Sequence, residues 1–198
     1  MIKKQIPARK KHAIYLASII LLSAIGASAA AWAWWRKANA SDAVKFSENY
    51  PLIGQDNVFV HKKTGEIIDI LGSGTGIVFL GFPQCIWCQA YAVILHEVAQ
   101  ELGVEEIFYG DIRHDRQNNT RNYQTIVSLL DGHLHLDDDG KPRIYVPDLT
   151  VVKDGQIVGR NNETSVMEGI APVDYWTNSR VDTLKRQLSA MIKEIYPE

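Results

Sequence analysis

Cys85 and Cys88 lie three positions apart at a sharp change in the pattern of apolar residues. Before them, Ile77–Leu80 is continuously apolar, as expected of a short strand buried on both faces. After them, apolar residues recur at intervals of three and four until Gly103, which predicts a helix with one buried face. That face would carry Tyr91, Leu95, Val98 and Leu102. The two cysteines are therefore predicted to lie at the junction of a buried strand and a helix.

A cysteine in the first turn of a helix is expected to be reactive. The unpaired N–H groups and partial positive charge there stabilise a thiolate, and Cys-X-X-Cys motifs lower the thiol pKa from about 8.5 to about 3.5–7. We therefore predict that Cys85 is the nucleophile. Cys88, one turn further in, would resolve the mixed disulfide by attacking Cys85. A redox-active Cys85–Cys88 disulfide would make any further cofactor unnecessary.

Three other interpretations of the pair stay open. A structural disulfide between such close neighbours would close a short loop and stabilise the chain weakly. A zinc site would need two more ligands, and the sequence has no second Cys-X-X-Cys. The pair could also be two inert buried thiols. His133 and His135, followed by Asp137–Asp139, resemble a metal cluster, but a solvated turn is the simpler interpretation, and we predict no metal.

Pro147 interrupts an apolar run, Arg143–Val152, that precedes a hairpin turn at Lys153–Gln156. Proline is excluded from the centre of a sheet unless it has a special role. A cis Val146–Pro147 bond would make a tight bend and expose the Val146 backbone beside the disulfide, where an extended substrate could pair with it. An ordinary trans proline at a strand end is the alternative. Trp87, between the cysteines, would contact substrate or pack against the domain.

The remaining patterns predict an α/β fold with a mixed central sheet. Further strands are expected at Val58–His61, Glu66–Ile70, Ile107–Ile112 and Ile157–Val158, the first two joined by a turn at Lys63–Gly65. Asp137–Gly140 is predicted to be a turn. A short helix is expected at Tyr123–Leu130. A closing helix would bury a face made of Val181, Leu184, Leu188, Met191, Ile192 and Ile195.

Residues 13–35 carry no charge, and about 20 such residues span a bilayer. Because residues 1–12 are basic, the positive-inside rule places them in the cytoplasm and the body outside. Three tryptophans, Trp32, Trp34 and Trp35, would anchor the end of the run at the interface, whereas Ala27–Ala29 offers a signal-peptide cleavage site. We predict a single-pass cell-membrane protein with one N-terminal transmembrane helix at 13–35, an anchor or uncleaved signal. A stalk, 36–57, and an extracytoplasmic domain, 58–198, would follow.

The charge of the chain is unevenly distributed. Residues 1–37 carry seven Lys and Arg and no acid, which leaves 14 basic and 23 acidic groups in the remaining 161 residues, a net charge of −9. Phosphate contacts need a basic face, so we predict that the body does not bind nucleic acid.

The chain resembles the thioredoxin superfamily in Gly76–Cys88, in the helix that follows, and in Val146–Leu149 through Lys153–Gly155. More narrowly, it resembles the membrane-anchored, extracytoplasmic thioredoxin-like proteins of Gram-positive bacteria of the bacteriocin-transport accessory type. This resemblance covers roughly residues 58–196. It implies a thioredoxin-like fold with Cys85 as the attacking thiol, Cys88 as the resolving thiol and Pro147 as a cis-proline.

Two positions depart from the pattern of the thioredoxins. Phe79 stands where thioredoxins keep a buried acid that moves protons for the second cysteine. The dipeptide Ile86-Trp87 is neither the Gly-Pro of the reductases nor the His-containing pair typical of strong oxidases. The first difference leaves open how Cys88 loses its proton, and the second leaves open the direction of the redox reaction.

The functional hypothesis is therefore a thiol–disulfide oxidoreductase that exchanges disulfides with exported proteins. Its site would comprise Cys85 and Cys88, with Trp87, Val146 and Pro147 contacting substrate. The alternative is a redox-inactive thioredoxin-like binding module that assists a secretion or bacteriocin-export system.

Overall fold

The structure is a computed structural model that describes residues 41–162 and 169–196. The predicted cytoplasmic tail, the predicted transmembrane segment at 13–35 and the first part of the predicted stalk lie outside these residues. Among the helices that are described, none is both long and apolar enough to cross a membrane.

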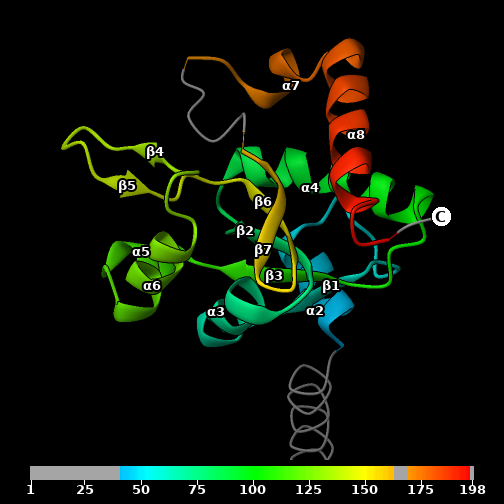
Figure 1. Ribbon diagram of the computed structural model, residues 1–198. Coiled ribbons are helices and arrows are strands. Elements are labelled where there is room, and N and C mark those ends of the chain that lie inside the picture. The colour runs from blue at the N-terminus through cyan, green and yellow to red at the C-terminus, as the bar shows by residue number, and fades with distance from the viewer. Residues whose placement is uncertain (1–40, 163–168, 197–198) are drawn as a thin grey trace, which may run out of the picture. The chain divides into compact units, whose positions relative to one another are not determined.

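The centre of the domain is a five-stranded mixed sheet with the strand order β1-β3-β2-β6-β7 (Figure 1). The strands β1, β3 and β2 are parallel, whereas β6 runs antiparallel to β2, and β7 antiparallel to β6. In sheet order the strands span Phe59–His61, Ile107–Asp111, Gly76–Gly81, Asp148–Lys153 and Gln156–Asn161. Every residue of the central strand β2 is buried, which confirms the strand predicted from its continuous apolar run.

Helices cover both faces of this sheet. Figure 1 shows α4 (Ile86–Glu101) and α8 (Asn178–Ile192) on one side and α3 (Thr64–Ser73) on the other. The remaining helices are α2 (Asp42–Asn49), α5 (Arg113–Gln117), α6 (Arg121–Leu129) and α7 (Pro172–Tyr175). This α/β arrangement with a mixed sheet is the thioredoxin-like fold that the resemblance implied, and α4, α6 and α8 confirm the three predicted helices.

The predicted stalk is wrong for residues 42–57. These residues belong to the folded domain, where α2 packs against β1. Phe46 in α2 is buried, and so are Tyr50 and Ile53 in the segment that follows it. The Phe46 ring stacks on the rings of Phe59 and Tyr50, with centroids 3.9 and 4.3 Å apart. Phe46 is the one fully buried residue within α2, so this short helix has no apolar repeat for a sequence pattern to reveal.

The strand predicted at Glu66–Ile70 is also wrong, because this segment lies in α3. A carboxylate oxygen of Glu66 accepts a hydrogen bond from the Lys63 N–H at 2.9 Å and satisfies one end of the helix. The helix buries Ile67 and Leu71, which are four residues apart. The β-branched pair at 67–68 suggested a strand, but this helical spacing and the Glu66 contact determine the structure.

The run from Arg143 to Val152, predicted to be broken by Pro147, is divided at that residue. Its first residue belongs to β5 (Pro142–Arg143), which pairs with β4 (His135–Leu136) around the predicted turn at Asp137–Gly140. Its second half is β6, which begins directly after Pro147 and leads into β7 through the predicted hairpin turn. The chain therefore returns to the centre of the sheet at residue 148, next to the end of β2.

Candidate active site

Cys85 occupies the N-cap position of α4, four residues beyond the end of β2. Its backbone is extended, and its sulfur accepts a hydrogen bond from the Cys88 N–H at 3.1 Å. The Cys85 sulfur therefore satisfies one of the N–H groups that a helix start leaves unpaired. Cys85 is partly exposed and Cys88 is 0% exposed, and both are thiols in the structure.

The two thiols have opposite acidities. The pKa of Cys85 is lowered, chiefly by a hydrogen bond with the Cys88 side chain, and further by the N–H groups of Cys88 and Trp87 and the charge of Arg116. Burial opposes this lowering. The pKa of Cys88 is raised well above its usual value, first by burial and then by its interactions with Cys85. The partly exposed sulfur is therefore the one that ionises first.

The segment that contains Pro147 lies beside Cys85. The Val146–Pro147 peptide bond is cis, as the resemblance implied. The Cys85 thiol donates to the carbonyl oxygen of Val146 across 3.8 Å, and Val146 is only 7% exposed. The backbone of Val146 is thus adjacent to the nucleophile, but it is more enclosed than expected, and a substrate strand would have to displace this thiol contact.

Trp87 is half-buried and packs against α7. Its ring meets the Tyr175 ring edge to face, with centroids 5.4 Å apart, and Tyr175 in turn contacts Trp176. This packing gives Trp87 a structural role, and contact with substrate stays a prediction.

Phe79 lies at the centre of β2, fully buried, and its ring stacks on Tyr91 of α4 with centroids 6.0 Å apart. Two buried tyrosines lie close by instead of an acid: the Tyr50 hydroxyl donates to the Tyr109 hydroxyl at 3.2 Å. Burial is the main cause that raises the pKa of both hydroxyls, and the nearby cysteines raise it further. Both tyrosines therefore stay protonated and keep their hydroxyl hydrogens as donors.

Gly81 provides the space in which Tyr50 and Cys88 approach each other. A Cβ atom on Gly81 would lie 3.3 Å from the Cys88 sulfur and 3.3 Å from the Tyr50 hydroxyl oxygen. The Cys88 sulfur and the Tyr50 hydroxyl oxygen are therefore separated by at most twice 3.3 Å. Sequence analysis missed Tyr50 because it lies in the segment taken for a stalk; the glycine at the end of a buried strand was the available signal of a close approach.

Arg116 of α5 is a second residue that sequence analysis missed. Its guanidinium group lies 5.0 Å from the centroid of the Phe82 ring and donates to the carbonyl oxygen of Ile144 at 3.4 Å. Its positive charge lowers the pKa of Cys85 and also acts on Cys88. The polar segment that contains Arg116 shows no periodicity, so only the fold reveals that its charge acts on the cysteines.

A buried ion pair fixes the strand that follows Pro147. Asp148 is 0% exposed and binds the guanidinium group of Arg160 on β7, while its second oxygen accepts from the Thr150 hydroxyl at 3.2 Å. Burial raises the pKa of Asp148, and the Arg160 charge acts against this increase. Because Asp148 also faces Leu80 in the sheet register, this pair holds β6 at the level of the cysteine loop.

His133 and His135 are exposed. The carbonyl oxygen of His133 accepts from Arg160, and the His135 ring lies near Tyr145, with centroids 6.5 Å apart. Within the described ranges, no three His, Cys, Asp or Glu residues are grouped in a way that could hold a metal ion.

The comparisons with known proteins add a structural likeness. No protein-family model matches the chain, and no curated protein matches its sequence. Among solved structures, thioredoxin O2 from Arabidopsis thaliana in the oxidized state is similar over 65% of this chain and 96% of its own. That likeness has 15% sequence identity and a TM-score of 0.36. The fold assignment above therefore depends on the strand order and on the connections of this chain.

Proposed function

We propose that this protein is a thiol–disulfide oxidoreductase in which Cys85 attacks and Cys88 resolves. The contrast between the two thiols carries the proposal: one is partly exposed with a lowered pKa, and the other is fully buried with a raised pKa. Exposure and thiolate character are the two properties that select an attacking thiol.

In the first step the Cys85 thiolate attacks one sulfur of a substrate disulfide. A bond forms between the two sulfurs, the substrate S–S bond breaks, and the released substrate thiolate takes a proton from solvent. In the second step Cys88 loses its proton to solvent and attacks the Cys85 sulfur, which releases the second substrate thiolate. The substrate gains two electrons, and the protein ends with a Cys85–Cys88 disulfide. The same steps in reverse oxidise a substrate dithiol.

Tyr50 supports the second step. While Cys88 is a thiol, the Tyr50 hydroxyl donates to Tyr109. When Cys88 ionises, a small shift of the Tyr50 ring toward the sulfur, with rotation of both hydroxyls, would let Tyr109 donate to Tyr50 and Tyr50 donate to the sulfur. The number of hydrogen bonds within the tyrosine pair is unchanged, and the buried thiolate gains a charge-assisted donor that Phe79 cannot provide.

Exported proteins are the proposed substrates, and the cell membrane is the proposed location. The uncharged run at 13–35 and the basic residues before it support an anchored protein whose body lies outside the cytoplasm. An oxidising compartment is also where disulfides form and persist, so substrates are available there.

An apolar groove next to Cys85 supports a polypeptide substrate. It has a volume of about 490 Å³ and is lined mainly by side chains of α4, α7 and α8. Two of the lining residues, Ile86 and Val173, are 62% and 84% exposed, and Ile86 directly follows the attacking cysteine. A binding module without redox activity would use the same groove, and this is the second candidate function.

Trapping of substrates tests the proposal in the full chain. Cys88→Ala should accumulate mixed disulfides between Cys85 and exported proteins, because Cys85 can attack but cannot be released. Cys85→Ala is the matched control and should accumulate none. Equal trapping by the two variants would contradict the order of attack. Unchanged co-purification of one partner with the Cys85→Ala/Cys88→Ala double variant, without any mixed disulfide in Cys88→Ala, would favour the binding module.

A further inference from the structure

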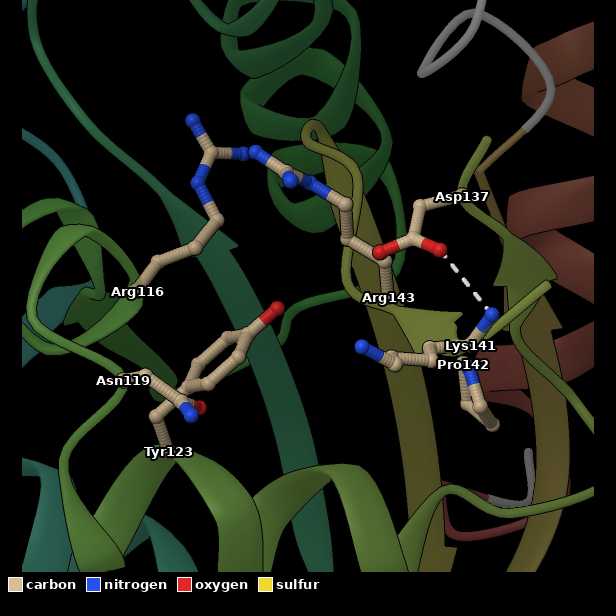
Figure 2. Close-up of a pocket in the computed structure, with 7 residues that line it drawn as sticks. All are labelled: Arg116, Asn119, Tyr123, Asp137, Lys141, Pro142 and Arg143. Atoms are coloured by element: carbon tan, nitrogen blue, oxygen red, sulfur yellow. Dashed lines mark hydrogen bonds between the residues drawn. The ribbon is translucent and has the colours of Figure 1, made fainter. Parts of the chain in front are cut away.

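A small cationic pocket lies on the side of the domain where α5 and α6 face the β4–β5 hairpin. Its volume is about 210 Å³. Figure 2 shows the side chains around it, and the guanidinium groups of Arg116 and Arg143 approach each other across its upper part. The lining residues are Arg116, Asn119, Tyr123, Asp137, Lys141, Pro142 and Arg143.

The two arginines of this pocket lack an acidic partner. Neither Arg116 nor Arg143 forms an ion pair with a carboxylate in residues 41–162 and 169–196. Arg116 donates only to a carbonyl oxygen, and Arg143 lies over the ring of Tyr145 at 5.5 Å. In an acidic body with a net charge of −9 outside residues 1–37, this is an unusual gathering of positive charge.

Asp137, the acid in the pocket, forms no ion pair with either arginine among the described residues, and it is not one of the groups that act on the pKa of Arg116. One carboxylate oxygen of Asp137 already accepts the N–H groups of Asp139 and Lys141, at 3.1 and 2.9 Å, and so holds the hairpin turn. Lys141 itself reaches Asp139, 3.8 Å away on the exposed tip. Burial lowers the pKa of Arg116, and the charge of Arg143 lowers it further, so the two guanidinium groups repel each other. An anion between them would relieve this repulsion.

The pocket adjoins the attacking cysteine through one short stretch of backbone. Arg116 donates to the carbonyl oxygen of Ile144, and the Cys85 thiol donates to that of Val146, two residues further along. The positive charge of Arg116 acts to lower the pKa of both cysteines. A molecule whose disulfide meets Cys85 therefore has the two arginines within reach of its neighbouring groups.

We propose that Arg116 and Arg143 bind a carboxylate of the disulfide or thiol that reacts with Cys85. The inference rests on the proposed function and adds a substrate preference to it. A guanidinium group presents a planar fork of donors that matches a carboxylate, and two of them can hold one from both sides. The carboxylate could belong to a small acidic disulfide or to an acidic residue near a cysteine of a polypeptide.

The test compares two small disulfides on the full chain in its reduced form. One is 5,5′-dithiobis(2-nitrobenzoate), which carries two carboxylates, and the other is neutral 4,4′-dithiodipyridine. The measured quantity is the ratio of their rates of reaction with Cys85. Arg143→Gln should lower this ratio about 3- to 10-fold, the effect of one partly exposed charged contact. Arg143 is chosen because Arg116 is one of the groups that lower the pKa of Cys85, whereas Arg143 is not.

Arg186→Gln is the matched control. Arg186 lies exposed on α8, and its loss changes the net charge by the same amount without touching the pocket. This variant should leave the ratio unchanged. An equal fall of the rate ratio in both variants would overturn the proposal, because the net charge of the protein would then explain the selectivity. An unchanged ratio in Arg143→Gln would overturn it too, because Arg143 would then make no contribution to the selectivity.

A pair of disulfide peptides, with Glu or Gln beside the cysteine, separates the two sources of the carboxylate. A preference for Glu that is lost in Arg143→Gln assigns the pocket to polypeptides, and a preference confined to the small dianion assigns it to small acidic disulfides. The neutral disulfide also tests the proposed function separately. If Cys85 reacts with it no faster than free cysteine, the oxidoreductase proposal fails and this inference fails with it. If Cys85 reacts faster than free cysteine but shows no preference for the acidic disulfide, only this inference is overturned and the oxidoreductase proposal stands.

Discussion

The hydroxyl oxygen of Tyr50 and the sulfur of Cys88 both lie 3.3 Å from the point where a side chain on Gly81 would begin. Tyr50 follows α2, Cys88 lies in the first turn of α4, and Gly81 ends the central strand. Three segments far apart in the sequence therefore meet beneath the attacking cysteine. The resolving thiol is fully buried there, and the hydroxyls of a buried tyrosine pair, Tyr50 and Tyr109, lie on the same side of Gly81.

Tyr50→Phe should slow the release of substrate from the mixed disulfide by roughly tenfold, the effect of one hydrogen bond to a charged group. The rate of the first attack by Cys85 should change little. Both rates can be followed by rapid mixing of the reduced full chain with a disulfide peptide. Tyr109→Phe is the control: it removes the partner of Tyr50 but leaves Tyr50 free to donate to Cys88, so release should slow less. Slower release in Tyr109→Phe than in Tyr50→Phe would exclude Tyr50 as the direct donor.

Gly81→Ala should lower the free energy of unfolding by about 1–3 kcal/mol, as expected for overpacking a dense core. The added methyl group would press on Cys88, on Tyr50 and, at 3.4 Å, on the end of the Phe79 ring. Chemical denaturation measures the loss. Gly54→Ala is the matched change, because nothing lies within 4 Å of a Cβ there, and it should have little effect. Equal stabilities of the two variants would show that the space beside Gly81 accepts a methyl group despite the 3.3 Å contacts.

The reactivity of Cys85 should extend to lower pH than that of free cysteine, whose pKa is about 8.5. Because its pKa is lowered, more of it is thiolate at neutral pH, and the midpoint of its alkylation by iodoacetamide should fall below the free value. Cys88→Ala should move the midpoint upward, since the Cys88 side chain is the largest cause of the lowering. Arg116→Gln should move it upward by less. A wild-type midpoint at or above that of free cysteine would contradict the assignment of the nucleophile.

Asp148→Asn should cost about 3–5 kcal/mol of unfolding free energy, because it leaves the guanidinium group of Arg160 buried without its counter-charge. Asp139→Asn is a control in an exposed ion pair with Lys141 and should cost less than about 1 kcal/mol. The double variant Asp148→Asn/Arg160→Gln should recover part of the loss, since both charges are then removed. Denaturant titrations of the three variants check this order, and similar losses for Asp148→Asn and Asp139→Asn would disprove it.

The sequence predicted the parts of the site that depend on neighbouring residues. The buried strand β2, the helix α4 and the place of Cys85 between them follow from local periodicity. The direction of each thiol's pKa shift also depends on this junction, because the first turn of α4 provides N–H groups to one sulfur and buries the other.

The parts that depend on distant segments could not be predicted. Tyr50 reaches Cys88 only because Phe46 stacks on β1, and that contact joins residues whose sequence pattern shows no relation. Arg116 lies in a polar segment without a repeat, and its place beside Phe82 is set by the end of β3. The error at Glu66–Ile70 has a different origin, since a β-branched pair there outweighed the capping glutamate.

The packing of α2 beneath the cysteine pair has a consequence for genetics. A screen for loss of disulfide exchange would return substitutions at Phe46 and Tyr50 as well as at the cysteines, although these positions precede Cys85 by more than thirty residues. If the Cys-X-X-Cys motif alone guided the interpretation, these substitutions would be assigned to a linker and disregarded. Their phenotype should instead resemble that of slow resolution, with substrates retained on Cys85 and the protein still present in the cell.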